Sequence, residues 1–366
     1  MNRDADFMRQ AIALARRGLG RTSPNPPVGA VVVARGRVVG RGWHRRPGAA
    51  HGEAMALHAA GARARGATLY VTLEPCNHHG RTPPCTEAIL AAGVRRVVFG
   101  ARDPNPHVRG GGAARLRRAG VEVLGGVERA ACEELIAGFV SLVRRGRPLV
   151  TLKLAATLDG RIATSSGDSR WISGPAARAL VHRWRDEMDA VMVGLGTVLA
   201  DDPRLTCRRR GGRDPLRVVV DSRLRIPLTA RVLTKEAAPA TLVASVTSRG
   251  RKLSALRARG ATVLSLPGRG GRVSLRRLLD ALGQRGVATV LLEGGATLAA
   301  AALREGLVDR LHVFLAPRVI GGDGLPMLAP LGVRRLRGAP RLRWLGAERV
   351  GDDWLLRAVP ERSHAR

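Results

Sequence analysis

The chain is poor in cysteine, in aromatic residues and in long apolar runs. Four cysteines among 366 residues are too few for the disulfide framework of a small secreted domain. Aromatic residues make up only 3% of the chain, so Ala, Val and Leu must build most of the core. No apolar run reaches the ~18 residues of a membrane-spanning helix, and the first residues lack the apolar segment of a signal peptide. We therefore expect a cytoplasmic protein with no membrane partner.

Acidic residues are also scarce. The chain has 62 Lys and Arg against 29 Asp and Glu, which gives a formal net charge of +33. Such a surplus attracts polyanions, so a nucleic acid is an alternative partner. The arginines are spread along the whole chain, however, and no basic stripe interleaved with aromatic residues offers bases a stacking platform. We expect weak non-specific attraction to nucleic acid at low salt and no specific nucleic-acid site.

The most informative motif is a histidine and two cysteines with a carboxylate close by. His51 precedes Glu53 by two residues, and Pro75-Cys76 and then Cys85 follow in the chain. Three protein ligands leave one position of a tetrahedral zinc ion for water, as in a catalytic site. His-x-Glu followed by Pro-Cys is typical of zinc-dependent nucleobase deaminases, in which the glutamate moves protons. The motif predicts zinc ligands at His51, Cys76 and Cys85, and a catalytic Glu53.

Other candidate metal ligands carry a weaker signal. His78 and His79 lie between the two cysteines, but one imidazole and two thiolates already suffice for zinc. Cys132 stands in a helical pattern, Ala130–Leu135, and Cys207 follows Leu205-Thr206; both are interpreted as plain thiols.

Helix and strand patterns alternate along both halves of the chain. A basic connector around residues 144–148 separates them, which predicts two domains, 1–146 and 147–366. In the second, short apolar strands at 149–155, 190–193, 217–220, 241–244, 262–266 and 289–292 alternate with helical segments. This alternation predicts an α/β domain with a mostly parallel sheet.

The second half lacks a Gly-x-Gly-x-x-Gly motif after its first strand, which counts against an ordinary Rossmann site. Glu293-Gly294-Gly295 instead follows an apolar strand and begins a helix, where backbone N–H groups can approach a pyrophosphate. Two glycines before a helix are also common in turns, so the motif by itself leaves both interpretations open.

Further motifs occur in order along both halves. The first half carries Pro24-Asn25-Pro26, the His51 and Cys76–Cys85 motifs and Asp103-Pro104-Asn105; the second carries Lys153–Gly160, Trp171-Ile172-Ser173, Gly196–Pro203 and Leu292–Gly295. Through these motifs the sequence resembles, over nearly its whole length, the bifunctional deaminase–reductases of riboflavin biosynthesis. The resemblance implies an α/β protein with an N-terminal three-layer domain like cytidine deaminase and a C-terminal domain like dihydrofolate reductase. One departure is Gly52, where the family usually has alanine; we expect only a local loosening of the helix.

The resemblance also implies two consecutive reactions. The first is zinc-dependent hydrolysis of the 2-amino group of 2,5-diamino-6-ribosylamino-4(3H)-pyrimidinone 5′-phosphate, and the second is reduction of the ribosyl group to ribityl by NADPH. In the deaminase it implies substrate contacts from Asn25, His44, Arg81, Asp103 and Asn105. Asn25 and Asn105 both precede proline, so each could equally be a turn residue.

In the reductase the resemblance implies two sets of contacts. The cofactor set is Ala155, Trp171, Thr197, Asp201, Ser222, Gly295, Ala296, Thr297, Leu298, Ala299, Ala300 and Ala301. The substrate set is Ser169, Arg185, Leu205, Arg208 and Glu293. Arg185 and Arg208 suit a clamp on the ribose phosphate, although chance placement is an alternative in so arginine-rich a chain. No general acid of the reductase is named.

Three other interpretations remain as alternatives. A nucleic-acid base deaminase would need a basic face bearing aromatic residues. A deaminase with a purely structural second domain would have lost the Lys153–Gly160 and Glu293–Gly295 motifs, and neither is lost. A zinc-stabilised interaction protein would have a fourth protein ligand in place of Glu53. The bifunctional enzyme, acting on a phosphorylated pyrimidine and forming a homo-oligomer, fits the sequence best.

Overall fold

The computed structural model describes residues 3–79, 83–105 and 111–361, and it divides the chain into two compact units. Unit 1 comprises Met1–Arg147 with Gly286–Ala288, and unit 2 comprises Pro148–Arg285 with Thr289–Arg366. Among the described residues, no helix is long and apolar enough to cross a membrane.

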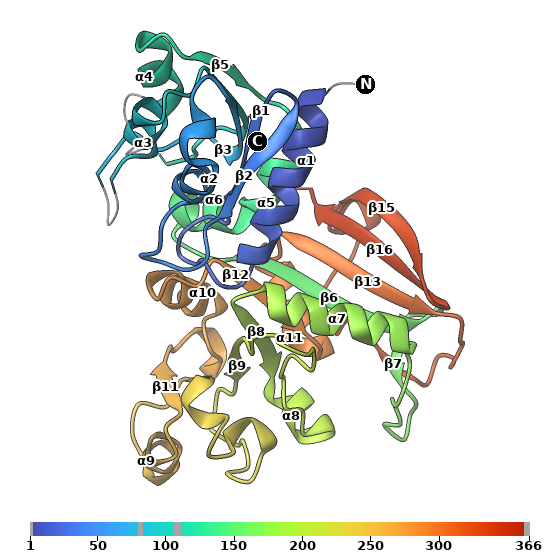
Figure 1. Cartoon of the computed structure of the whole chain (residues 1–366). Coiled ribbons are helices and arrows are strands. Elements are labelled where there is room, and N and C mark those ends of the chain that lie inside the picture. Colours follow the sequence, from blue (N-terminus) through green and yellow to red (C-terminus); the bar gives the residue numbers. More distant parts are fainter. Residues whose placement is uncertain (1–2, 80–82, 106–110, 362–366) are drawn as a thin grey trace. The chain divides into compact units, whose positions relative to one another are not determined.

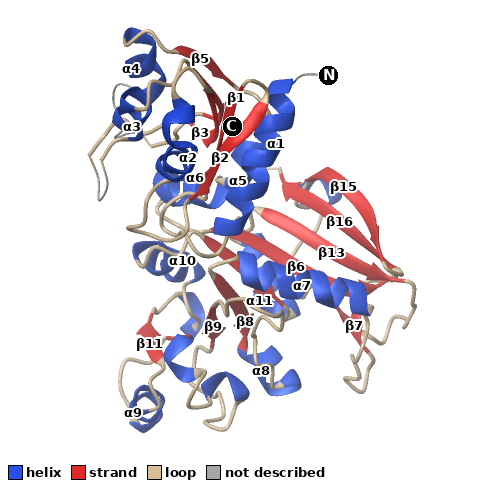
Figure 2. Ribbon diagram, in the orientation of Figure 1, coloured by secondary structure: helices blue, strands red, loops and turns tan. Residues whose placement is uncertain are grey.

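Unit 1 is a three-layer α/β/α structure built on a five-stranded sheet of order β2-β1-β3-β4-β5 (Figures 1 and 2). Helices α1 and α5 pack on one face of the sheet, and α2 packs on the other. The elements are α1 Arg3–Ala15, β1 Gly29–Ala34, β2 Arg37–Trp43, α2 Gly52–Ala60, β3 Thr68–Leu73, α3 Cys85–Ala91, β4 Arg96–Ala101, α4 Gly112–Arg118, β5 Glu122–Gly125, α5 Arg129–Leu135 and α6 Ala137–Arg145. Strands β1 and β2 form an antiparallel hairpin on either side of Arg35-Gly36.

Glycines in β2 set the position of α2. A Cβ atom at Gly40 would lie 2.1 Å from the Ala56 carbonyl oxygen, and one at Gly42 would lie 2.3 Å from the Gly52 carbonyl oxygen. Helix α2 can approach β2 so closely only because the residues at these positions of β2 have no side chain. Helix α3 begins directly after Pro83-Pro84, with Pro84 at its N-cap.

Unit 2 contains a nine-stranded sheet of order β11-β10-β9-β8-β12-β6-β13-β16-β15. The strands from β11 to β13 in this order are parallel, and β16 and β15 add antiparallel neighbours at one edge, as the mostly parallel prediction required. The elements are β6 Leu149–Thr157, β7 Arg161–Ala163, α7 Pro175–Glu187, β8 Ala190–Gly194, α8 Leu195–Asp201, β9 Leu216–Val220, β10 Thr241–Ser245, α9 Arg251–Ala258, β11 Thr262–Ser265, α10 Leu275–Gln284, β12 Thr289–Glu293, α11 Ala296–Arg304, β13 Arg310–Ala316, β14 Leu325–Pro326, β15 Leu342–Val350 and β16 Asp353–Pro360.

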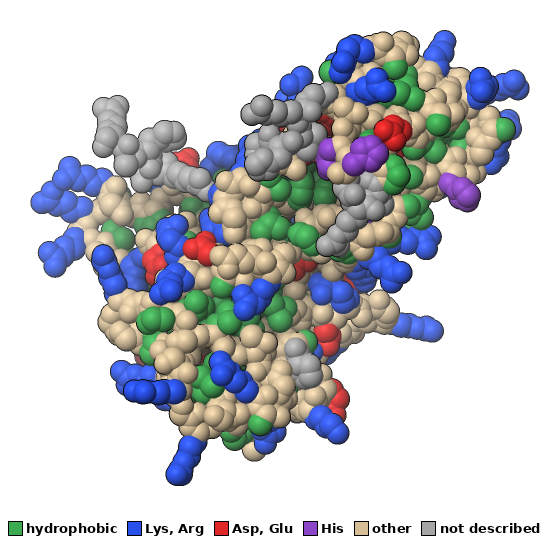
Figure 3. Space-filling view, turned by 90° about the vertical axis from the view of Figure 1, so that its left-hand side faces the viewer, with side chains coloured by type: hydrophobic (Ala, Val, Ile, Leu, Met, Phe, Trp, Pro, Cys, Tyr) green, Lys and Arg blue, Asp and Glu red, His purple; other side chains and the backbone are tan. Residues whose placement is uncertain are grey.

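Helix α7 lies across β6 and β13 in unit 2 (Figure 1), and the Trp184 ring of α7 lies 5.5 Å from the Phe314 ring of β13. Cores in both units consist mainly of Val, Leu, Ala and Ile side chains, in keeping with the shortage of aromatic residues. On the face drawn in Figure 3, Lys and Arg side chains are scattered and do not gather in a single patch.

Candidate active sites

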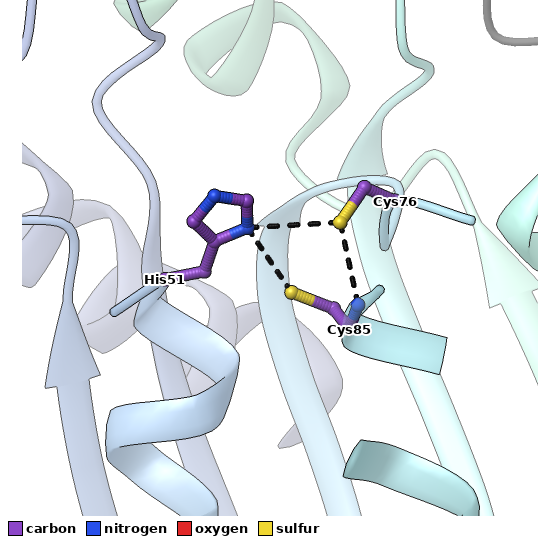
Figure 4. Close-up of side chains that lie close together, drawn as sticks. All are labelled: His51, Cys76 and Cys85. Carbon is purple, nitrogen blue, oxygen red and sulfur yellow. Dashed lines mark hydrogen bonds between the residues drawn. The ribbon is translucent and has the colours of Figure 1, made fainter. Parts of the chain in front are cut away.

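Three potential metal ligands converge in unit 1 from separate segments. His51 is the N-cap residue of α2, Cys76 follows β3, and Cys85 is the first residue of α3. The His51 Nδ1 atom lies 3.2 Å from Cys85 Sγ and 3.6 Å from Cys76 Sγ, and all three ligand atoms lie within 4.8 Å of one another (Figure 4). Ligand atoms around a tetrahedral zinc ion are separated by about 3.5–3.8 Å, given Zn–S and Zn–N bonds of about 2.3 and 2.0 Å. The donor set and its spacing therefore fit zinc.

The two thiols differ in their readiness to ionise. A hydrogen bond from the Cys85 side chain, with a further one from His51, lowers the pKa of Cys76 to about 4. The same thiol–thiol hydrogen bond raises the pKa of Cys85. The Cys85 backbone N–H also donates to Cys76 Sγ over 3.3 Å. The cluster thus favours a thiolate at Cys76, which is the form that binds metal.

Glu53 lies in the first turn of α2, two residues after His51. Its side chain is buried at 4% exposure, and its Oε2 atom has no hydrogen-bond partner among the described residues. Burial raises the pKa of Glu53, opposed by the nearby His51. An unpaired buried carboxylate oxygen is costly unless a ligand uses it. Glu53 therefore has the position and the free oxygen that a proton-transferring group needs.

Gly52, next to Glu53, has a role in packing that the expected local loosening of the helix did not include. A Cβ atom here would lie 2.9 Å from the Val28 carbonyl oxygen, so an alanine would force a backbone shift. The glycine therefore allows close packing of the helix start against the segment that leads into β1.

A cavity of about 350 Å³ in unit 1 is lined by His51, Cys76 and Glu53. Asn25, His44, Asp103 and Asn105 line it together with Glu53, so the structure brings together four of the five expected substrate contacts. The fifth, Arg81, lies outside the described residues.

Hydrogen bonds hold the expected contact residues in place. His44 is buried; its Nε2 lies 3.1 Å from Asn25 Nδ2, and its Nδ1 lies 3.2 Å from the Ala50 carbonyl oxygen. Asp103 accepts a hydrogen bond of 2.9 Å from the Asn105 backbone, and burial raises the pKa of Asp103. Asn25 and Asn105 thus take part in hydrogen bonds of their loops and also line the cavity.

Two further side chains on the cavity wall are informative. Glu74, which the sequence analysis missed, lines the cavity and accepts a hydrogen bond from the Ala113 backbone over 3.1 Å. Glu74 directly follows β3 and precedes Pro75-Cys76. Its position beside a zinc ligand in the motif was the feature of the sequence that could have indicated a place on the cavity wall. His78 lines the cavity but lies outside the cluster of three ligands, while His79 is exposed and lies 3.4 Å from Glu87.

In unit 2, the glycines Gly294 and Gly295 lie close to the Thr197 hydroxyl, where the neighbouring strands β12 and β8 end. Helix α8 begins directly after β8, and α11 begins after β12 and the Gly294-Gly295 pair. Both glycines have positive φ, and a Cβ atom on either would lie 3.3 Å from the Thr197 Oγ1 atom. Glycines at a helix start leave backbone N–H groups open to a pyrophosphate. The residues present therefore fit a dinucleotide cofactor.

The expected cofactor segment on α11 is only partly accessible. Leu298, Ala299 and Ala300 are buried in the core, whereas Thr297 in the first turn is exposed. Within the Gly295–Ala301 segment, the side chains that are not buried are those of Ala296, Thr297 and Ala301.

A buried ion pair lies close to this cradle. Arg185 of α7 donates to both carboxylate oxygens of Glu293 over 2.7 Å each, and to the Thr206 carbonyl oxygen over 3.1 Å. Lys153 of β6 stands opposite Glu293 in the sheet, and burial lowers the pKa of Lys153. The sequence analysis quoted Lys153 in a motif but assigned it no role. Three charged side chains at one point of a sheet indicate a polar ligand site.

The other expected contacts of unit 2 lie on loops and strand ends. They are Ala155 in β6, Ser169 and Trp171 before α7, Asp201 at the end of α8, Leu205 and Arg208 after it, and Ser222 after β9. Trp171 is exposed beneath the Arg178 guanidinium, and Arg208 is exposed. Leu205 is buried at 2% exposure, so its side chain belongs to the core.

Comparisons with known proteins agree with both sites. Residues 1–101 match the model of the cytidine and deoxycytidylate deaminase zinc-binding region, and residues 148–356 match the RibD C-terminal domain. His51, Cys76 and Cys85 therefore form a zinc-binding deaminase site, and the reductase domain implies NAD(P)H.

Full-length relatives cover both halves. Riboflavin biosynthesis protein RibD of Actinobacillus pleuropneumoniae is 43% identical over 96% of this chain and 94% of its own length. The Escherichia coli protein of the same name is 40% identical, covering 97% and 99%. Among solved structures, Acinetobacter baumannii RibD has a TM-score of 0.88 at 40% identity, covering 98% and 99%. A deaminase/reductase from Thermotoga maritima has a TM-score of 0.87 at 37% identity, with the same coverage. The chain belongs to the RibD family, the bifunctional deaminases and reductases of riboflavin biosynthesis.

Proposed function

We propose that residues 1–146 deaminate 2,5-diamino-6-ribosylamino-4(3H)-pyrimidinone 5′-phosphate, and that residues 147–366 then reduce its ribosyl group to ribityl with NADPH. The observation that carries the proposal is the buried Glu53 Oε2 atom, which has no hydrogen-bond partner among the described residues, in a 350 Å³ cavity that the zinc ligands His51 and Cys76 also line. A cavity of this size suits one small ligand.

In the first reaction the protein supplies positioning and proton transfer. A zinc ion held by His51, Cys76 and Cys85 would activate the attacking water. Glu53 takes a proton from that water at its Oε2 atom and passes it to the ring nitrogen as the water oxygen bonds to the ring carbon. Glu53 then takes the proton of the added hydroxyl and delivers it to the amine, which leaves as ammonia while the carbonyl forms. Asn25, Asp103 and Asn105 offer donors and acceptors to the base and ribose, and Arg81 suits the phosphate.

In the second reaction the protein aligns two molecules. The nicotinamide cofactor supplies the hydride. Gly295 and Thr197 border the pyrophosphate cradle, and Glu293 orients sugar hydroxyls while Arg185 holds its carboxylate in place. Three of the five N–H groups of Arg185 donate within the protein, which leaves two for the substrate. Arg208, which is exposed, supplies the remaining charge for the ribose phosphate.

A coupled assay on zinc-quantified protein tests both reactions. The diaminopyrimidinone ribotide is supplied, and ammonia release and NADPH oxidation are followed together. Both signals, with about one zinc per chain, support the proposal. Ammonia without NADPH oxidation would refute the reductase role. Neither signal from folded, zinc-loaded protein would refute both roles and turn attention to RNA substrates.

We further propose that the chain forms a homo-oligomer through β15 and β16. Strand β15 ends the sheet of unit 2, and Trp344, Leu345 and Trp354 on this pair are 62%, 51% and 52% exposed. An open edge strand with exposed tryptophans suits a second copy of the same edge. Trp344→Glu should reduce the mass measured by sedimentation to that of a single chain, and an unchanged mass would refute this interface. The cytoplasmic location remains a prediction.

A further inference from the structure

An arginine-rich segment that follows α8 lies against α7 in unit 2. The segment spans residues 205–213 and contains four arginines. Its Arg208 backbone N–H donates a hydrogen bond to His182 Nδ1 over 3.4 Å. The thiol of Cys207 donates to the His182 backbone carbonyl oxygen, also over 3.4 Å. His182 therefore binds the segment through both its side chain and its backbone.

Other contacts fix the segment on either side of Arg208. Leu205 adopts a positive φ of 54°, and its side chain is 2% exposed, so its burial must hold this strained conformation in place. The Cys207 backbone N–H donates to the Asp214 carboxylate over 2.8 Å. The buried carboxylate of Asp186, in α7, accepts a hydrogen bond from the segment's last backbone N–H, that of residue 213, over 2.8 Å. Between these anchors, the His182 ring holds the Arg208 backbone.

Arg185 lies one turn along α7 from His182 and on the same side of the helix, because residues three positions apart in a helix are neighbours. Its guanidinium donates to the Thr206 carbonyl oxygen over 3.1 Å and to both carboxylate oxygens of Glu293. Residues 206–208 are therefore bound to two successive turns of α7. These contacts use the backbone of Arg208, and the Arg208 side chain is exposed, where it can bind a ligand.

The surroundings of His182 keep its ring neutral. Burial lowers the pKa of His182, and the positive charges of Arg185 and Arg208 lower it further. Glu293 and the Thr206 carbonyl group act in the opposite direction. A neutral imidazole can accept a hydrogen bond at Nδ1, whereas a protonated one cannot. The ring is thus in the form that can hold the Arg208 backbone N–H.

We propose that His182 is a positioning residue of the reductase, which holds Arg208 where its guanidinium binds the 5′-phosphate of the deaminated substrate. The inference rests on the proposed reductase function and on the clamp of Arg185 and Arg208. Without the hydrogen bond to His182, the Arg208 segment would have to be ordered when substrate binds, and this ordering would weaken binding. The 5′-phosphate is at the opposite end of the sugar from C1′, which is reduced when ribosyl becomes ribityl. His182 should therefore affect substrate affinity and leave the hydride-transfer step unchanged.

The test compares His182→Leu and His182→Asn in full-length, zinc-loaded protein. NADPH oxidation with the deaminated ribotide gives kcat and KM, and calorimetry gives Kd values for this ribotide and for the same nucleoside without its phosphate. Leucine cannot accept a hydrogen bond, so KM and Kd for the ribotide should rise about five- to tenfold, while kcat and the nucleoside Kd stay within about twofold. The Asn Oδ1 atom can accept in place of Nδ1, so His182→Asn should recover most of the affinity.

His58→Leu is the matched control. His58 is exposed on α2 in unit 1, so its loss should change none of these quantities. Should His182→Leu fail to fold, His182→Ser replaces it, because serine is polar but too short to reach the Arg208 backbone.

Three results would overturn the proposal. The first is an unchanged Kd for the ribotide in the folded variant that lacks the acceptor. The second is an equal loss of affinity for ribotide and nucleoside, which would mean that His182 supports the whole site and not the phosphate contact. The third is a failure of His182→Asn to recover affinity. If the wild-type protein does not oxidise NADPH, the reductase function is refuted, while the two Kd values still test the role of His182.

Discussion

Replacing Glu53 by glutamine tests the proton-transfer step with the smallest change in shape. The Glu53 side chain is buried and its Oε2 atom is free of partners among the described residues, so an amide fits the same space but cannot accept and return a proton. Proton transfer by a positioned side chain contributes about 10²- to 10⁴-fold to a rate, or about 3–5 kcal/mol of activation free energy. We expect ammonia release to fall by this factor.

Zinc content and reduction should stay unchanged in the same variant. Glu53 lies outside the cluster of His51, Cys76 and Cys85, so zinc per chain, measured by atomic emission, should equal that of the wild type. NADPH oxidation should also persist when the deaminated intermediate is supplied. Glu133→Gln, on the exposed and ion-paired Glu133 of α5, makes the same chemical change away from the cavity and should leave ammonia release unaltered. Ammonia release at the wild-type rate from zinc-loaded Glu53→Gln would refute the role of Glu53.

Three other predictions concern the metal, a buried ion pair and a surface ion pair. The Cys76→Ser variant should bind no zinc and release no ammonia, but it should still oxidise NADPH when the deaminated intermediate is supplied. Loss of both reactions would contradict this and would show that the metal also supports unit 2. Glu293→Leu should lower the free energy of unfolding by about 3–5 kcal/mol in urea, because the Arg185 guanidinium then stays buried without its counter-ion; a loss under about 1 kcal/mol would contradict this. The hydrogen bond from the Arg96 side chain lowers the pKa of Asp4 in the folded protein. The ion pair therefore stabilises the fold at pH values above the pKa of Asp4 in the unfolded chain, which is about 4. This contribution is lost as the pH falls through the lower pKa of the folded state. Asp4→Asn should therefore cost about 1 kcal/mol near neutral pH and progressively less below about pH 4, measured by unfolding at each pH, and a constant difference would contradict the assignment.

The zinc site could be predicted from the sequence because its chemistry is local. His51 and Glu53 stand two residues apart at a helix start, and Cys76 and Cys85 border one loop. Short segments of the sequence therefore show both the type of each ligand and the spacing between ligands. The alternation of strands and helices brings these segments together. The structure confirmed this cluster and the parallel sheet of unit 2.

Other features depend on residues that are far apart in the chain. Arg185 and Glu293 are separated by 108 positions, and nothing in either neighbourhood indicates a mutual ion pair. The same holds for Lys153, whose place beside Glu293 follows from the pairing of β6 with β12. Among so many arginines, sequence alone could not tell a paired guanidinium from a free one.

The sequence by itself determined the zinc ligands, the carboxylate of Glu53 close to them and the α/β character of both halves, because these depend on residue chemistry and periodicity over short stretches. Only the tertiary structure decided which charges meet. It joined Arg185 to Glu293, and it left Oε2 of Glu53 without a hydrogen-bond partner among the described residues. The physical reason is that strand order and register bring distant residues together, and neither is encoded within any single segment.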